Sequence, residues 1–253
     1  MEPANEKRFG KVPEVTFIFW LIKIAATTLG ETGGDAVSMS MNLGYLLSTG
    51  IFALVFFIFV SAQIKAGGFH PFLYWATIIA TTTVGTTLAD FCDRSLHIGY
   101  AGGSSLLLAL LIISLVAWHR TLGSVSISTV SSPKAEIFYW VTIMFSQTLG
   151  TALGDWTADT EGFGFLNSAA VFGGMLAVVA ALYLFTKISR TALFWAAFVL
   201  TRPLGAVLGD FFDKPAAQGG LALSRYSASA TLVVFIIACI LIFKQRPAKN
   251  TAH

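Results

Sequence analysis

The sequence has little charge and almost no cysteine. Only 11% of its 253 residues are charged, whereas 55% are hydrophobic. A soluble domain carries about a quarter charged residues, so this chain has too few to cover a large core with a water-facing surface. The net charge of +3 is too small for nucleic-acid binding. Cys92 and Cys239 lie far apart, which argues against a disulfide framework or a thiolate zinc site.

Motifs of common enzymes are also missing. The chain contains no G-x-x-x-x-G-K-[ST], H-E-x-x-H, C-x-x-C or G-x-S-x-G pattern. We therefore expect no ATP hydrolysis, no enzyme activity and no bound cofactor.

Long apolar stretches are what the sequence has instead. Most run about 16 to 21 residues, close to the roughly 20 that a helix needs to cross a bilayer. There are eight of them, at 15–30, 43–62, 71–89, 101–118, 137–154, 165–185, 191–209 and 231–243. The pattern predicts an all-α polytopic membrane protein with eight transmembrane helices and the lipid bilayer as its main partner.

The stretches are organised by an internal repeat, W-x9-G-x4-D, which occurs four times without a gap. It comprises Trp20, Trp75, Trp140 and Trp195, then Gly30, Gly85, Gly150 and Gly205, then Asp35, Asp90, Asp155 and Asp210. Repeats 2 and 4 end alike, in Asp-Phe-Cys-Asp-Arg and Asp-Phe-Phe-Asp-Lys. We expect the tryptophans to have a structural role at one end of each odd-numbered helix rather than to bind a cofactor.

The repeat defines the domain organisation. Repeats 1 and 2 (15–64 and 70–120) occupy residues 1–120, and a Ser/Thr-rich linker follows at 121–133. Repeats 3 and 4 (134–187 and 189–246) occupy 134–246, before a tail at 247–253.

With its tryptophans and paired apolar stretches, the chain resembles a bacterial membrane-protein family of four tandem repeats of unknown function. The resemblance covers nearly the whole chain. It implies two membrane helices and one tryptophan per repeat, in the bacterial inner membrane, but no particular activity.

Because each repeat has two spans, all four point the same way. This predicts pseudo-twofold or pseudo-fourfold symmetry about the membrane normal. One end of the bundle would hold both termini, with eleven Lys and Arg residues against four acids, and the opposite end nine acids against three cations. The positive-inside rule then places both termini in the cytoplasm.

At about 100° per residue, one stripe of each odd-numbered helix contains the positions 8, 11, 15 and 18 residues after the tryptophan. The stripe includes Thr28, Thr83 and Thr148 at +8, Glu31, Thr86 and Thr151 at +11, the four aspartates at +15, and Asp93 and Asp213 at +18. Beside it lie small residues that allow close helix packing, namely Gly30, Gly34, Gly85, Gly150, Gly154, Gly205 and Gly209.

We expect this stripe to bring the carboxylates together on a shared axis. Carboxylates and hydroxyls suit hard cations, and gathered carboxylates also bind protons. The sequence thus favours a proton-coupled exporter of a divalent metal ion, Mn²⁺ above others, with Asp35, Asp90, Asp155 and Asp210 as ligands. Two other functions are possible from the sequence, namely a cation channel and a non-transporting sensor or anchor subunit. A homo-oligomer is also possible. So is the alternative that the aspartates only end their helices among the lipid headgroups.

Two cations lie inside the predicted spans. Arg202, at +7, borders the stripe, and we expect it to act as a tethered counter-cation or as a structural ion-pair partner. Lys23, at +3, is expected to snorkel toward the membrane surface.

Overall fold

The computed structural model describes residues 10–95, 99–159 and 163–248, and eight α-helices lie within these ranges. The odd-numbered helices are α1 (Phe17–Asp35), α3 (Pro71–Asp90), α5 (Pro133–Asp159) and α7 (Arg190–Asp213). The even-numbered helices are α2 (Gly44–Lys65), α4 (Tyr100–Leu122), α6 (Gly164–Phe185) and α8 (Arg225–Ile242). Single π-helical turns, η1 (Ala36–Ser40) and η2 (Phe91–Ser95), continue α1 and α3. The predicted all-α class is confirmed for the described ranges.

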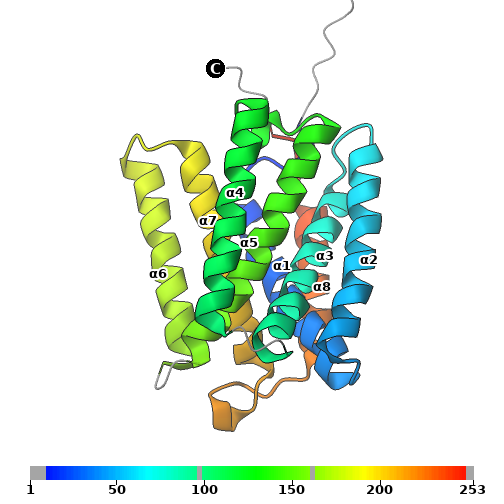
Figure 1. Cartoon of the computed structure of the whole chain (residues 1–253), viewed down its shortest axis with the longest axis vertical. Coiled ribbons are helices and arrows are strands. Elements are labelled where there is room, and N and C mark those ends of the chain that lie inside the picture. Colours follow the sequence, from blue (N-terminus) through cyan, green and yellow to red (C-terminus); the bar gives the residue numbers. More distant parts are fainter. Residues whose placement is uncertain (1–9, 96–98, 160–162, 249–253) are drawn as a thin grey trace, which may run out of the picture.

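The odd-numbered helices form an inner ring in which α1 contacts α3 and α7, and α5 contacts the same two helices (Figure 1). Each even-numbered helix packs outside, on the odd-numbered helix of the following repeat: α2 on α3, α4 on α5, α6 on α7, and α8 on α1. Because the last repeat covers the first, all four repeats are needed to close the structure. Both described ends of the chain lie at one end of the bundle, which we call the terminal end (Figure 1).

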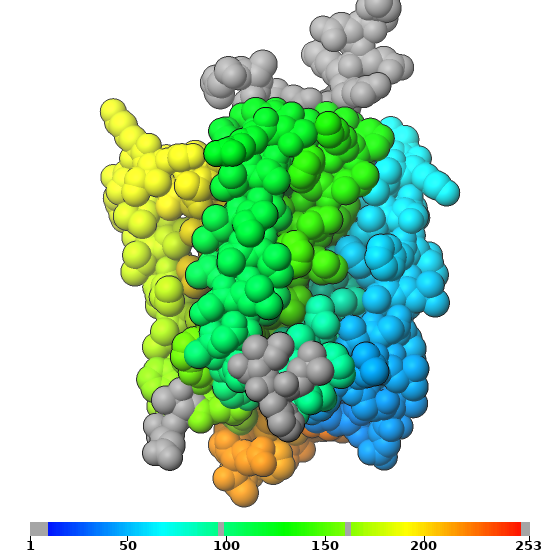
Figure 2. Space-filling model, in the orientation of Figure 1, coloured from blue at the N-terminus to red at the C-terminus, as the bar shows by residue number. Residues whose placement is uncertain are grey.

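Six of the eight helices are long and apolar enough to cross a membrane, namely α2, α3, α4, α6, α7 and α8. The outer helices expose many large apolar side chains, and α2, α4 and α6 form much of the surface in Figure 2. Helices α1 and α5 are not among the six. Their polar residues are mostly buried against neighbouring helices, so ring packing keeps these residues away from an apolar exterior.

Glycine contacts close the inner ring. The repeat glycine of each odd-numbered helix abuts the +7 residue of the next one around the ring. The four contacts are Gly30 with Thr82, Gly85 with Gln147, Gly150 with Arg202, and Gly205 with Thr27. Four residues later, Gly34, Gly154 and Gly209 abut the +11 residues Thr86, Ala206 and Glu31. The small residues therefore lie at the closest contacts between neighbouring helices.

Aromatic side chains fill the ring at the terminal end. Each tryptophan follows a Phe or Tyr, and the eight rings contact one another in a closed circuit: Phe19, Trp20, Phe194, Trp195, Tyr139, Trp140, Tyr74 and Trp75. Trp75, Trp140 and Trp195 are buried. We call this circuit the aromatic annulus. It places the tryptophans in the protein core.

The chain ends are joined beyond the annulus. Pro13 and Pro247 form an antiparallel bridge, and the Glu14 amide donates to the Arg246 carbonyl at 2.8 Å. The start of the tail predicted at 247–253 is thus fastened to the N-terminal segment.

Gly205→Ala tests the ring contacts. In an exposed helix, alanine gains about 0.5–1 kcal/mol over glycine, but here its Cβ would lie 2.5 Å from Thr27 Cβ and 2.9 Å from the Thr27 carbonyl carbon. We expect overpacking to cost about 1–3 kcal/mol and to lower the Tm of the detergent-solubilised protein. Gly173→Ala in α6 is the control, because nothing lies within 4 Å of that Cβ. Equal Tm values for the two variants would contradict this account.

Candidate functional site

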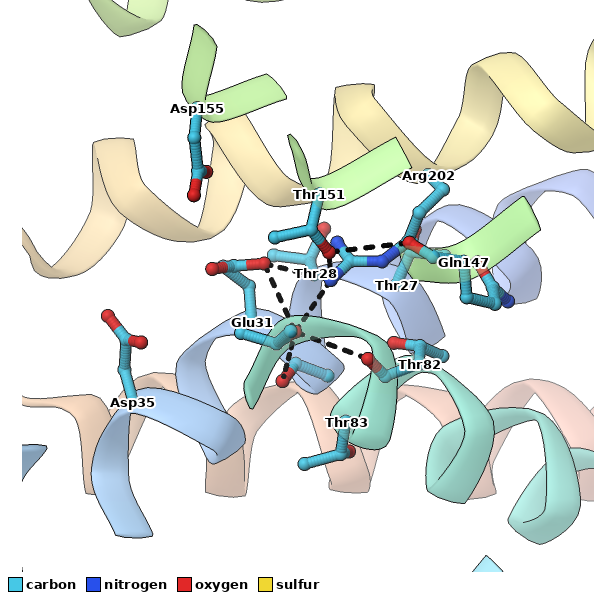
Figure 3. A network of polar contacts seen from close by, with 12 residues as sticks. Thr27, Thr28, Glu31, Asp35, Thr82, Thr83, Gln147, Thr151, Asp155 and Arg202 are labelled. Carbon is cyan, nitrogen blue, oxygen red and sulfur yellow. Dashed lines mark hydrogen bonds and ion pairs between the residues drawn. The ribbon is translucent and has the colours of Figure 1, made fainter. Parts of the chain in front are cut away.

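The centre of the ring holds a buried ion pair. Arg202 of α7 is 0% exposed, and its Nη2 lies 3.0 Å from Glu31 Oε2 of α1. The same nitrogen donates to Thr86 Oγ1 of α3 at 2.6 Å and to Thr151 Oγ1 of α5. Figure 3 shows Arg202, Glu31 and Thr151 pointing toward one another from three helices. One guanidinium nitrogen therefore contacts the +11 residue of every other inner helix.

The +8 threonines of the predicted polar stripe are buried but lie outside the Arg202 network. Thr28, Thr83 and Thr148 donate their hydroxyl hydrogens to the carbonyl four residues earlier in their own helices, at 3.0, 2.8 and 3.0 Å. The network around Arg202 connects the +7 position of α7 to the +11 positions of the other inner helices.

Sequence reasoning missed Thr27, Thr82 and Gln147 as ring residues, although all three share the +7 position with Arg202. Each is 0% exposed and faces a glycine of the neighbouring helix. On a straight helix, positions four residues apart, such as +7, +11 and +15, are rotated by about 40° from one to the next. A projection of an isolated helix therefore places +7 away from the face that holds the aspartates. The sequence signal that could have identified these three residues is that they occupy the same repeat position as Arg202.

The four aspartates are buried, with exposures of 1% to 4%, but they do not converge on one point. They form two pairs, each bridged by a cation. Lys214 Nζ lies 2.7 Å from Asp35 Oδ2 and 2.9 Å from Asp210 Oδ1. On the other side, Arg94 Nε lies 3.1 Å from Asp90 Oδ1, and its Nη2 lies 3.7 Å from Asp155 Oδ2.

These two clusters are equivalent by the repeat. Arg94 and Lys214 each follow their own aspartate by four residues and also reach the aspartate of the next repeat around the ring. The similar endings of repeats 2 and 4 thus have a structural meaning, because they supply the two bridging cations. The arrangement at this end, which we call the acidic end, has twofold rather than fourfold equivalence.

One group of carboxylates in the described residues could hold a metal ion. It consists of Glu31, Asp35 and Asp210, whose ligand oxygens lie within 4.8 Å of one another. Asp90 and Asp155, two of the four predicted aspartate ligands, lie outside this group and share Arg94 instead. Glu31 joins the group because α1 and α7 are neighbours in the closed ring.

The second carboxylates at +18 differ from each other. Asp213 pairs with Arg225 Nε at 2.7 Å and is 9% exposed. Asp93 is partly exposed, and no described cation pairs with it. The candidate residues at +18 therefore lie at the edge of the carboxylate group and do not enter it.

Counter-cations control the charge of the site. Arg202 reaches Glu31 and none of the four aspartates, whereas Lys214 pairs with two of them. Burial by itself would lower the pKa of Lys214, but Asp210 and Asp35 raise it above its usual value. Lys214 is consequently charged at neutral pH.

Lys23 does not snorkel. Its side chain is 0% exposed, and Nζ lies 4.2 Å from the centroid of the Phe198 ring. The expectation failed because α1 lies in the inner ring, where the ammonium meets α7 before it can reach the bundle surface.

The Arg202 and Glu31 pair gives a stability prediction. Arg202→Met leaves a buried carboxylate unpaired, and we expect it to cost about 3–5 kcal/mol. The double variant E31Q/R202M removes both charges and should recover most of that loss, as measured by Tm in detergent. A double variant as unstable as R202M would show that the charge pairing is not what holds this layer together.

Comparison with known proteins gives a family but no activity. A family model described as "Repeat of Unknown Function (DUF347)" matches the chain four times, at residues 18–69, 73–124, 138–189 and 193–246. No curated protein and no solved structure matches the chain. Each match contains most of one inner helix and the outer helix that follows it. Because the matches cover well over half of the sequence, the chain belongs to the DUF347 repeat family.

Proposed function

We propose that the protein is a cation carrier of the bacterial inner membrane that exchanges a divalent metal ion, such as Mn²⁺, for protons. The observation that supports this most directly is the group of three buried carboxylates, Glu31, Asp35 and Asp210. Carboxylates at membrane depth are costly and usually mark ion pathways or proton relays. Three carboxylate oxygen ligands suit Mn²⁺ or Mg²⁺ rather than a soft metal.

Protons are the natural exchange partner at such a site. Carboxylates that release a metal ion repel one another at short range, and bound protons remove that repulsion. The site lies at the acidic end of the inner helices, while the aromatic annulus fills the ring at the terminal end. This filling at one end supports a carrier, which changes conformation during transport, rather than a channel that is permanently open.

The proposal includes a membrane topology. All eight helices span the bilayer, with α1 and α5 protected from lipid by the ring, and the pseudo-symmetry axis runs along the membrane normal. The positive-inside rule places the terminal end in the cytoplasm and the metal site toward the outside.

The transport proposal predicts that Asp210→Asn abolishes Mn²⁺ uptake by proteoliposomes, because one of three ligands loses its charge. Asp35→Asn should act alike. Asp159→Asn is the control, since Asp159 also lies at the acidic end but is exposed and accepts a hydrogen bond from Tyr100 at 2.5 Å. It should transport as wild type does. Equal transport by D210N and wild type would favour a sensor or anchor role instead.

The topology predicts that a green fluorescent protein fused after residue 253 is fluorescent, whereas alkaline phosphatase fused there is inactive. Alkaline phosphatase inserted after Gly219, in the segment between α7 and α8, should be active. The reverse pattern of activities would invert the proposed orientation.

A further inference from the structure

Lys214 occupies the middle of the proposed cation site. Its ammonium nitrogen lies 2.7 Å from Asp35 Oδ2 and 2.9 Å from Asp210 Oδ1, and its side chain is 13% exposed. Asp35 Oδ1, the other oxygen of that carboxylate, is buried and has no hydrogen-bond partner among the described residues. A single ammonium therefore satisfies only part of the site.

The lysine comes from outside the helices that supply the carboxylates. It follows the last residue of α7, and the segment after it folds back onto the helix end. The Ala222 amide donates to the Lys214 carbonyl at 2.9 Å, and the Leu221 amide donates to the Phe211 carbonyl at 2.7 Å. The backbone of Lys214 is thus held, while its four-carbon stem enters the site from the acidic end. A lysine stem is flexible and its ammonium is strongly hydrated, so the head group can move out toward water.

Charge favours replacement of this ammonium by a divalent ion. Glu31, Asp35, Asp210 and the neighbouring Asp213 carry four negative charges. Arg202, Lys214 and Arg225 offset them with three positive ones, because Arg225 pairs with Asp213 and also lies 3.6 Å from Asp35 Oδ2. If a divalent ion took the place of Lys214, the cluster would become neutral. If the ion entered with Lys214 still in place, the cluster would carry excess positive charge.

The equivalent cluster around Arg94 provides a comparison within the same ring. Arg94 bridges Asp90 and Asp155 and also donates to Tyr45 Oη at 3.4 Å. In this cluster the +11 residue equivalent to Glu31 is Thr151, whose hydroxyl accepts a hydrogen bond from Arg202. With two carboxylates and a planar guanidinium, this cluster lacks the third anionic ligand of the first.

We infer that Lys214 is an internal cation that fills the divalent-ion site in the metal-free protein and leaves it when the metal ion binds. Arg94 is its permanent counterpart and holds the opposite side of the ring together. This inference rests on the proposed function, and it identifies the residue that sets metal affinity.

Equilibrium binding of Mn²⁺ to the purified full-length protein in detergent tests the inference, with free Mn²⁺ read from its electron paramagnetic resonance signal. Lys214→Ala should lower the Kd by about tenfold or more, because a competing charge is removed. Lys214→Arg should raise the Kd, since a guanidinium can bridge the two carboxylates with several donors and is harder to displace. If K214A does not fold, Lys214→Gln gives the same comparison with a neutral side chain of similar length.

Two variants control for general electrostatics. Arg94→Ala removes one positive charge at the same end, and Lys187→Ala removes one from an exposed site at the terminal end. Lys187→Ala should leave the Kd within about twofold of wild type, because screening weakens the field of a distant exposed charge. Arg94→Ala should lower the Kd much less than Lys214→Ala does, because Arg94 pairs with none of the three proposed ligands. A gain in R94A equal to that in K214A would overturn the inference, because the effect would then belong to net charge.

The outcomes separate this inference from the proposed function. If wild type binds Mn²⁺ and D210N does not, but neither K214A nor K214Q binds more tightly, only the role of Lys214 fails. If D210N binds as wild type does, or if wild type, K214A and K214Q all fail to bind, both proposals fail. Binding that appears only when Lys214 is neutralised would support both.

Discussion

The close approach of the four inner helices is the constraint on which the rest of the structure depends. It requires a glycine where each helix meets the +7 side chain of the next, as Gly150 meets Arg202. At that separation, an arginine from one helix can hydrogen-bond to residues of the other three. A ring closed this tightly must bury any polar side chain on its inner faces. It must therefore provide each with a partner or pay the desolvation cost.

Partners for the buried acids come from equivalent places in different repeats. Arg94 and Lys214 each bridge two aspartates, one in their own repeat and one in the next. These contacts cross the boundaries between repeats, just as the outer helices do. Ion pairing and packing thus join the same neighbours, so the acidic end and the ring are stabilised together.

The four repeats differ at one layer of the inner ring. The +11 position is Glu31 in the first repeat but Thr86, Thr151 and Ala206 in the others. Within the part of the chain that the structure describes, only the side where α1 meets α7 has three carboxylates close enough to hold a metal ion. The other side has a pair of aspartates bridged by Arg94. The residue at +11 therefore distinguishes the candidate ion site from its counterpart.

The sequence by itself determined the helical class, the four repeats, the equivalence of their aspartates and the polarity of the two ends, because periodicity and composition are local properties. Only the tertiary structure decided the partners. It buried Lys23 and brought Glu31 beside Asp210. Residues in the first and last repeats meet because the ring closes. No spacing within one helix encodes which helix lies beside it, so the composition of the carboxylate group depends on long-range packing.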